Sequence, residues 1–196
     1  MKRTFDLVFS LMILILFLPF GLVISLLILF TSPGGVFYRQ ERIGKKGVPF
    51  MLYKFRSMRT NADQSGRLTV GMKDSRVTNV GFFIRKYKLD EFPQFINVVC
   101  GTMSIVGPRP EVREFVALYS EEQRKILTVK PGITDYASLE YFDENEQLAQ
   151  SNDPKKTYIE EVMPHKLEIN QKYLSRPTLG HDLQIIFKTI KRILKN

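Results

Sequence analysis

Two adjacent acidic residues, Asp90 and Glu91, stand among cations near the middle of the chain. Arg85, Lys86 and Lys88 come just before them, and the pattern predicts that a short helix begins at the pair. Acids in the first turn of a helix lie at the positive end of its dipole, and nearby cations favour ionised carboxylates. Such a pair can attack a phosphorus centre or bind a divalent metal. It can also do no more than complement the dipole, so the pair alone leaves its chemistry open.

The helix itself is expected to be short and to end at Gly101, because glycine adopts the left-handed conformation that closes a helix. Pro93 falls in its first turn, where backbone N–H groups have no intrahelical partner. Four apolar residues at helical spacing predict one inward face: Leu89, Phe92, Ile96 and Val99. Beyond the helix, Pro108-Arg109-Pro110 predicts a rigid turn in which two prolines restrict the backbone around one arginine.

A second group of cations lies on a predicted β-hairpin. Val36–Ile43 and Pro49–Met58 are rich in β-forming residues and flank the turn Gly44-Lys45-Lys46-Gly47. Lys54 and Arg56 are two residues apart on the second strand and therefore share a face. Two cations presented together suit a phosphate or an acidic side chain, although a solvated basic strand explains them equally well.

The N-terminal region predicts a membrane anchor. Leu7–Phe30 contains no charged residue and is long enough, at about 1.5 Å per residue, to cross a hydrocarbon core of about 30 Å. Pro19 predicts a kink near its middle. Lysines and arginines flank the run on both sides, which gives no clear orientation. We therefore favour a re-entrant helix over residues 1–32 to a simple crossing, with residues 33–196 as a cytoplasmic domain.

Composition narrows the kind of partner. The net charge of +9 and the pI near 9.6 favour anionic partners such as phosphorylated small molecules, lipid headgroups or nucleic acid. The single cysteine, Cys100, excludes an internal disulfide and is expected to be a buried packing residue. His165 and His181, with this one cysteine, are too few for a zinc site.

The C-terminal half is expected to be mostly helical. The runs Glu111–Leu127 and Pro154–Leu174 predict helices, the second interrupted at Pro164, and the acidic stretch Asp135–Asp153 predicts a surface loop. The tail predicts a basic amphipathic helix that lies on lipid or packs on the core. Its apolar stripe is Leu183, Ile186, Phe187, Ile190 and Leu194. The fold class is thus α+β: a small, mostly helical domain with one hairpin, a re-entrant membrane helix and surface amphipathic helices.

Long motifs along most of the chain resemble one family. They are KRTFD, YRQERIG, YKFRSM, DSRVTNVGFFIRK, LDEFPQFINVVCGTMSIVGPRP, KPGITDYASLE and YIEEVMPHKLEINQKYL. Together they resemble the bacterial monotopic phosphoglycosyl transferases, which initiate glycan assembly, and the length is similar to that of the minimal members. The resemblance implies a bacterial inner-membrane enzyme with its active site on the cytoplasmic face.

The resemblance also implies a reaction. Asp90 would attack the β-phosphorus of a UDP-sugar, release UMP and hold the sugar phosphate until polyprenol (undecaprenyl) phosphate accepts it. Glu91, with Asp90, would bind Mg²⁺. Arg85 would clamp the transferring phosphate, and Lys54 and Arg56 would be secondary anion contacts. Pro108, Arg109 and Pro110 would form the uridine site. Inner-membrane lipid is then a partner and nucleic acid is not; a homo-oligomer is left open, as are the sugar and the glycan pathway.

Three positions depart from the family pattern: Leu18 before the kink, Gly35 after the anchor and Lys88 at the start of the dyad helix, where it weakens the N-cap. Two other functions remain to be weighed. A membrane-tethered basic adaptor would explain the charge, but an acidic pair inside the basic patch would weaken its binding to polyanions. An ordinary glycosyltransferase would release UDP instead of UMP.

Overall fold

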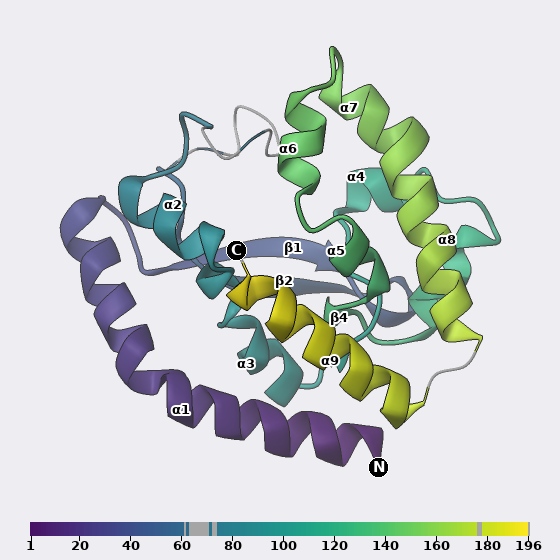
Figure 1. The fold of residues 1–196 in the computed structure, drawn as a ribbon, viewed down its shortest axis with the longest axis horizontal. Coiled ribbons are helices and arrows are strands. Elements are labelled where there is room, and N and C mark those ends of the chain that lie inside the picture. Colours follow the sequence, from purple (N-terminus) through teal and green to yellow (C-terminus); the bar gives the residue numbers. More distant parts are fainter. Residues whose placement is uncertain (61, 63–70, 72–73, 176–177, 196) are drawn as a thin grey trace.

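The computed structural model describes residues 1–60, 62, 71, 74–175 and 178–195. Helix α1 (Lys2–Thr31) runs along one side of a compact body and bends near its middle, where Pro19 lies (Figure 1). It is long and apolar enough to cross a membrane. The predicted long apolar helix with its proline bend is therefore confirmed.

Polar side chains fasten the first turns of α1 to the body. Arg3 donates to the carbonyl oxygens of Val98 and Val99 at 2.6 and 2.9 Å. Asp6 is buried and accepts a hydrogen bond of 2.8 Å from the Ser104 hydroxyl. These contacts end after the first turns, and most of the later apolar side chains of α1 are exposed.

The predicted hairpin is present. Strand β1 (Phe37–Ile43) pairs antiparallel with β2 (Pro49–Phe55), and the register places Tyr38 opposite Lys54. The turn between them, η1 (Lys45–Gly47), uses positive φ angles at Lys46 and Gly47. A pair that the sequence did not predict lies beneath: β3 (Ser104–Val106) and β4 (Gly132–Thr134) are parallel.

The dyad segment is divided more finely than predicted. Helix α2 (Asn79–Lys86) is followed by the single turn η3 (Leu89–Glu91), and α3 (Gln94–Val99) starts after Pro93. The predicted inward face is wrong, because Ile96 is exposed whereas the polar Gln94 and Asn97 are buried. Asn97 is buried since it bonds both main-chain groups of the hairpin that face it, Tyr53 N–H and Met51 C=O. Cys100 is exposed, not buried.

The C-terminal half also corrects two predictions. The expected helix Glu111–Leu127 contains only α4 (Arg113–Val116) and the 3₁₀ turn η4 (Gln123–Thr128). Ser120 and Gln123 exchange side chain to backbone hydrogen bonds there, which start a new turn. The expected loop holds α5 (Tyr136–Glu140) and α6 (Glu144–Ala149).

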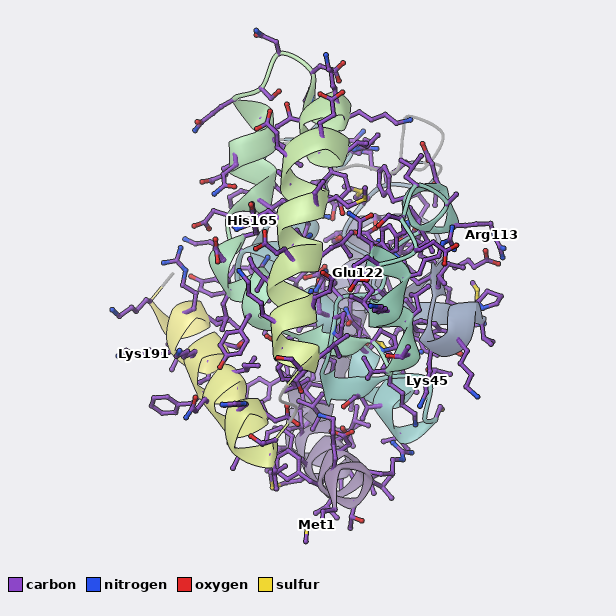
Figure 2. All side chains as sticks on the ribbon, turned by 90° about the vertical axis from the view of Figure 1, so that its right-hand side faces the viewer. Met1, Lys45, Arg113, Glu122, His165 and Lys191 are labelled. Atoms are coloured by element: carbon purple, nitrogen blue, oxygen red, sulfur yellow. The ribbon has the colours of Figure 1, made fainter. Side chains whose placement is uncertain are left out.

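The last helices follow the prediction more closely. Helix α7 (Pro154–Thr157) continues through the π-helical η5 (Tyr158–Val162) into α8 (Met163–Leu174), and Pro164 lies in the first turn of α8. Helix α9 (Leu179–Leu194) then crosses the body beside the parallel strand pair. Figure 2 places α9 and the end of α1 that carries Met1 at the same end of the molecule, with Lys191 on the outer side of α9.

Candidate active site

The acidic pair lies in η3, between the end of α2 and the start of α3. Lys88 takes a left-handed conformation (φ 55°) that turns the chain back, so that η3 presents its carboxylates to a cavity. Lys88 caps η3 with no side-chain hydrogen bond, as its long side chain predicted. Asp90 is 5% exposed, which makes it a buried carboxylate at the wall of that cavity.

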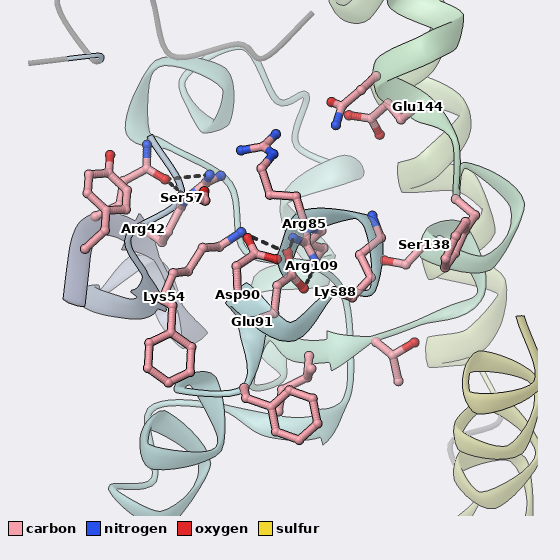
Figure 3. Close-up of a pocket in the computed structure, with 18 of the residues that line it drawn as sticks. Arg42, Lys54, Ser57, Arg85, Lys88, Asp90, Glu91, Arg109, Ser138 and Glu144 are labelled. Carbon is pink, nitrogen blue, oxygen red and sulfur yellow. Dashed lines mark hydrogen bonds and ion pairs between the residues drawn. The ribbon is translucent and has the colours of Figure 1, made fainter. Parts of the chain in front are cut away.

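Glu91 is surrounded by cations. The Lys54 ammonium lies 2.9 Å from its Oε1, and the Arg109 guanidinium donates to both oxygens, at 3.1 Å to Oε2. Burial alone would raise the Glu91 pKa, but Arg109 and Lys54 hold it well below the usual range. Glu91 is therefore ionised, and its charge is neutralised by two partners on different segments (Figure 3).

Asp90, the residue before Glu91, has a different environment. Among the described residues its carboxylate accepts no hydrogen bond from a side chain or backbone. Burial raises its pKa, and Lys54, Arg85 and Lys88 oppose the rise without pairing with it. The sequence predicted two ionised carboxylates of the same kind. The structure separates them into Glu91, which is neutralised by direct partners, and Asp90, which has free oxygens beside cations.

Arg109 reaches Glu91 because the Pro-Arg-Pro turn is fixed by its own backbone. Pro108 and Pro110 have no N–H group, so Arg109 supplies the turn's only main-chain donor, which bonds Asp135 Oδ2 at 2.8 Å. Asp135 is 1% exposed and also accepts from Ser138 N–H and from the Asn170 amide. Asp135 thus fastens the Arg109 turn to α5 and α8. This role was not predicted, because Asp135 was expected at the start of a surface loop and in fact caps α5.

The remaining predicted residues take two positions. Arg85 of α2 lines the same cavity as the dyad, and among the described residues its guanidinium has no hydrogen-bond or ion-pair partner (Figure 3). Arg56 is buried and donates to the Ser32 carbonyl at 2.8 Å and to its hydroxyl at 3.0 Å. The structure therefore brings Lys54, Arg85 and Arg109 to the dyad. It ties Arg56 to the segment where α1 ends.

The cavity at the dyad has a volume of about 720 Å³. Figure 3 shows Lys54, Arg85, Lys88 and Arg109 on the dyad side, with Ser138 and Glu144 across from them. The Ser138 hydroxyl is shielded from solvent and has no hydrogen-bond partner within the described part of the chain. These far-side residues were not predicted, since they fall in the segment expected to be a loop; the DYASLE motif around Ser138 was the one signal available.

Comparison with known proteins places this architecture in a family. The family model described as "Bacterial sugar transferase" matches residues 1–196. The chain is 39% identical over 196 residues to the UDP-N-acetylgalactosamine-undecaprenyl-phosphate N-acetylgalactosaminephosphotransferase of Aeromonas hydrophila, covering 98% of this chain and 43% of that protein. It is 35% identical over 198 residues to the UDP-glucose:undecaprenyl-phosphate glucose-1-phosphate transferase of Escherichia coli (strain K12), covering 97% and 39%.

A third relative is similar in length. The exopolysaccharide production protein ExoY of Sinorhizobium fredii is 34% identical over 207 residues, with 98% of this chain and 84% of that protein covered. The chain spans only about two fifths of the Aeromonas and Escherichia relatives, at 43% and 39% of their lengths. The family match along the whole chain nevertheless includes the dyad, the Pro-Arg-Pro turn and α1, and the protein belongs to the bacterial sugar transferase family.

Proposed function

We propose that this protein transfers a sugar 1-phosphate from a UDP-sugar to polyprenol phosphate, giving polyprenol-diphosphate-sugar and UMP, as the first membrane step of bacterial glycan assembly. The observation that carries the proposal is the dyad: a buried Asp90 carboxylate lies beside cations, next to a Glu91 whose charge is already neutralised. Two relatives are named as transferases that use undecaprenyl phosphate, and a third for exopolysaccharide production.

In the proposed first step, an Asp90 oxygen attacks the β-phosphorus of the UDP-sugar. A bond forms between that oxygen and the phosphorus, the bond from the β-phosphorus to the oxygen bridging it to the α-phosphorus breaks, and UMP leaves with the electron pair. Asp90 suits this role because its oxygens are free of hydrogen bonds within the described residues. The sugar phosphate is then held as an acyl phosphate on Asp90.

In the second step, a phosphate oxygen of polyprenol phosphate attacks the same phosphorus. The new P–O bond forms as the bond to Asp90 breaks, which restores the carboxylate and completes the lipid product. Both steps bring anions together, and a covalent intermediate divides one difficult displacement into two. Arg85 and Lys54 would contact the transferring phosphate, because both lie at the dyad wall of the cavity.

The donor's nucleotide end has two further candidates. Arg109 would stack on uracil, since its N–H groups pair with Glu91 and its side chain is still 32% exposed. Pro108 and Pro110 would limit the turn's movement when UDP-sugar binds. Arg56 lines the cavity and holds the end of α1 through its bonds to Ser32, so it would make only a secondary contact with an anion.

We also propose that Mg²⁺ binds at the dyad, through Asp90 and Glu91. Mg²⁺ commonly takes one or two carboxylates together with substrate phosphates and waters. Asp90 offers oxygens without hydrogen bonds among the described residues, and Glu91 would share its oxygens with Lys54 and Arg109. Among the described residues there is no group of three or more His, Cys, Asp or Glu arranged for a metal, so substrate would have to supply ligands. Bound Mg²⁺ would reduce the repulsion between the diphosphate and the carboxylates.

For the location, we propose the cytoplasmic face of the bacterial inner membrane, with α1 entering and leaving by that face. The bend at Pro19 and the polar contacts that hold Arg3 and Asp6 to the body support an α1 whose two ends stay with the domain. Epitope tags on both ends of the chain test this in intact cells and inverted vesicles. Accessibility of both tags from the cytoplasm supports re-entry, and accessibility from opposite sides would refute it.

The experiment for the reaction measures which nucleotide is released. Protein in nanodiscs meets a panel of UDP-sugars with Mg²⁺, with and without undecaprenyl phosphate, alongside Asp90→Asn, Glu91→Gln and the exposed control Glu122→Gln. We expect UMP and a lipid-linked sugar phosphate from the unmodified protein and the control only. UDP release would instead indicate glycosyl transfer. No turnover together with tight, salt-sensitive polyanion binding would support the adaptor.

A further inference from the structure

Part of the lining of the dyad cavity is apolar and is not used by the proposed phosphate chemistry. It comes from α1, α3 and α9, and α3 lies between the other two helices in Figure 1. We call it the α1–α9 groove, and its lining side chains are Phe9 and Ile13 of α1, Phe95 of α3, and Ile186, Ile190 and Ile193 of α9. All six line the same cavity as Asp90 and Glu91, so one cavity holds both the carboxylates and this hydrocarbon surface.

Charged and aromatic lining residues are neighbours in the sequence. Phe92 directly follows Glu91 and lines the same cavity. Its ring stacks on Phe17 of α1 with centroids 3.7 Å apart and lies 5.9 Å from the ring of Phe95. Phe92 and Phe95 therefore line the cavity just after the dyad in sequence, and Phe92 connects this part of the lining to α1 through Phe17.

A ligand in the groove would not need to form hydrogen bonds with the side chains that line it. The one pair of hydroxyls on its wall is internally satisfied, since Thr134 and Thr189 bond each other at 2.7 Å and Thr189 also donates to Ile185 C=O. The other lining groups of the groove are hydrocarbon or aromatic. An apolar chain would therefore bind there without leaving a buried donor or acceptor unpaired.

The groove also opens to an apolar surface. Ile190 lines it and is still 48% exposed, and beyond it on α9 Leu194 is 81% exposed. On α1, Leu16 and Phe20 are 63% and 65% exposed. A ligand chain leaving the groove would thus continue over side chains that suit lipid rather than water.

We propose that the α1–α9 groove binds the first isoprene units of the polyprenol phosphate acceptor, with its phosphate directed to Asp90. A ligand with an anionic head and a long hydrocarbon tail matches both parts of the lining: Lys54, Arg85 and Lys88 suit the head, and the groove suits the tail. The sugar nucleotide is polar throughout and has no part that matches the groove. This assignment rests on the proposed function, because it takes the acceptor from it.

The test uses matched substitutions inside and outside the groove. Ile190→Asn and Ile13→Asn place an amide on the groove wall, whereas Leu194→Asn and Leu16→Asn place one on the same helices outside it. Equilibrium binding of undecaprenyl phosphate to each variant in nanodiscs needs no turnover. Dimethylallyl phosphate, which has a head but too little chain to fill the groove, is the comparison ligand, and vesicle flotation monitors membrane attachment.

We expect the groove variants to bind undecaprenyl phosphate about tenfold more weakly, the loss that corresponds to one buried aliphatic side chain. Their binding of dimethylallyl phosphate should stay within about twofold of the unmodified protein, and the outside variants should change neither. Equal weakening inside and outside the groove would overturn the assignment, as would equal loss for both ligands. A groove occupied by an ordinary phospholipid chain would show no preference for the prenyl ligand over an added acyl phosphate.

The binding result is separable from the proposed reaction. If the unmodified protein releases no UMP from any donor yet the groove variants lose the prenyl ligand selectively, the reaction is wrong and the groove remains. If all variants release UMP normally in the absence of acceptor, and only transfer to undecaprenyl phosphate falls in the groove variants, the proposed reaction and the groove assignment are both supported. Release of UMP with unchanged acceptor binding in every variant would refute the groove assignment and leave the proposed reaction in place.

Discussion

Two regions reverse the usual distribution of charged and apolar side chains in a water-soluble protein. One is the dyad wall, and the other is the outer face of α1 and α9, by which we mean their exposed apolar side chains. At the dyad, Asp90 is 5% exposed and Glu91 is enclosed by an arginine and a lysine. On the outer face, Phe30 is 85% exposed and Phe187 is 69% exposed. Charge is inside and hydrocarbon is outside, and each arrangement is unfavourable in water unless something compensates for it.

The two regions differ in where that compensation comes from. The dyad is stabilised from within the protein, because Lys54 and Arg109 neutralise Glu91, and Asp135 holds the turn that carries Arg109. The described residues offer the outer face nothing comparable, so its stabilisation must come from its surroundings. The dyad should therefore respond to single substitutions at the protein's own residues, and the outer face should respond mainly to the lipid.

The largest effect is expected from Asp90→Asn. The substitution keeps the shape and removes the proposed nucleophile, so UMP formation should fall by at least about a thousandfold. The fold should be unaffected or slightly more stable, because a buried carboxylate with no hydrogen bond in the described chain becomes neutral. Rates of UMP release and thermal unfolding check both parts. Asp90→Asn protein that retains near-normal turnover would show that the nucleophile lies elsewhere.

Glu91→Gln should weaken the fold as well as the reaction. It leaves Lys54 and Arg109 facing each other without the anion between them, and breaking a partly buried pair in this way costs about 2–3 kcal/mol of unfolding free energy. Adding Lys54→Met should recover a substantial part of that loss, since one of the two unpaired charges is removed. Denaturant unfolding of the single and double variants measures this. Strictly additive losses would mean that Lys54 and Glu91 do not stabilise each other.

Asp135→Asn should have a smaller effect, about 1–2 kcal/mol of unfolding free energy, because one acceptor oxygen for Arg109 N–H and its neighbours becomes a donor. Asp153→Asn is the matched control: Asp153 also accepts from the backbone three residues on, at 3.0 Å, but it is exposed and touches nothing in the site. The control should lose less than about 1 kcal/mol. Catalytic loss in Asp135→Asn that disappears in an Arg109→Ala background would confirm that Asp135 acts through Arg109.

Sequence reasoning succeeded where local chemistry decides the structure. Two runs of β-forming residues around a glycine-bounded turn predicted the hairpin, and Pro19 within an apolar run predicted a bent helix. The motif resemblance assigned Asp90, Glu91 and Arg109 to one site; the structure pairs Arg109 with Glu91, and the roles assigned to the three residues stay predictions. Periodicity on its own misjudged Ile96 and Asn97, because burial there is decided by the hairpin's unpaired main-chain groups and not by apolarity.

The failures share a physical cause: the deciding partner was distant in sequence. Asp135 looked like part of an acidic loop, but a carboxylate with three donors around it is a structural centre wherever those donors come from. The parallel pairing of β3 with β4 joins segments that are each only three residues long, which no local pattern announces. Ser138 lines the cavity and was not predicted to do so, because it lies in the same segment that was expected to be a loop.

Substitutions on the outer face are expected to change stability least. They test whether the exposed side chains there contact lipid. The sequence contains no tryptophan, so Phe187→Trp creates a single fluorescent reporter on α9, and Leu118→Trp creates one beyond α4, where Leu118 is 53% exposed. Both should unfold within about 0.5 kcal/mol of the unmodified protein, as surface substitutions do. In vesicles, brominated lipids should quench Phe187→Trp and leave Leu118→Trp bright. Equal quenching at both positions, or none at Phe187→Trp, would mean that α9 does not lie on the bilayer, and the exposed hydrocarbon of α9 would then need a protein partner to cover it.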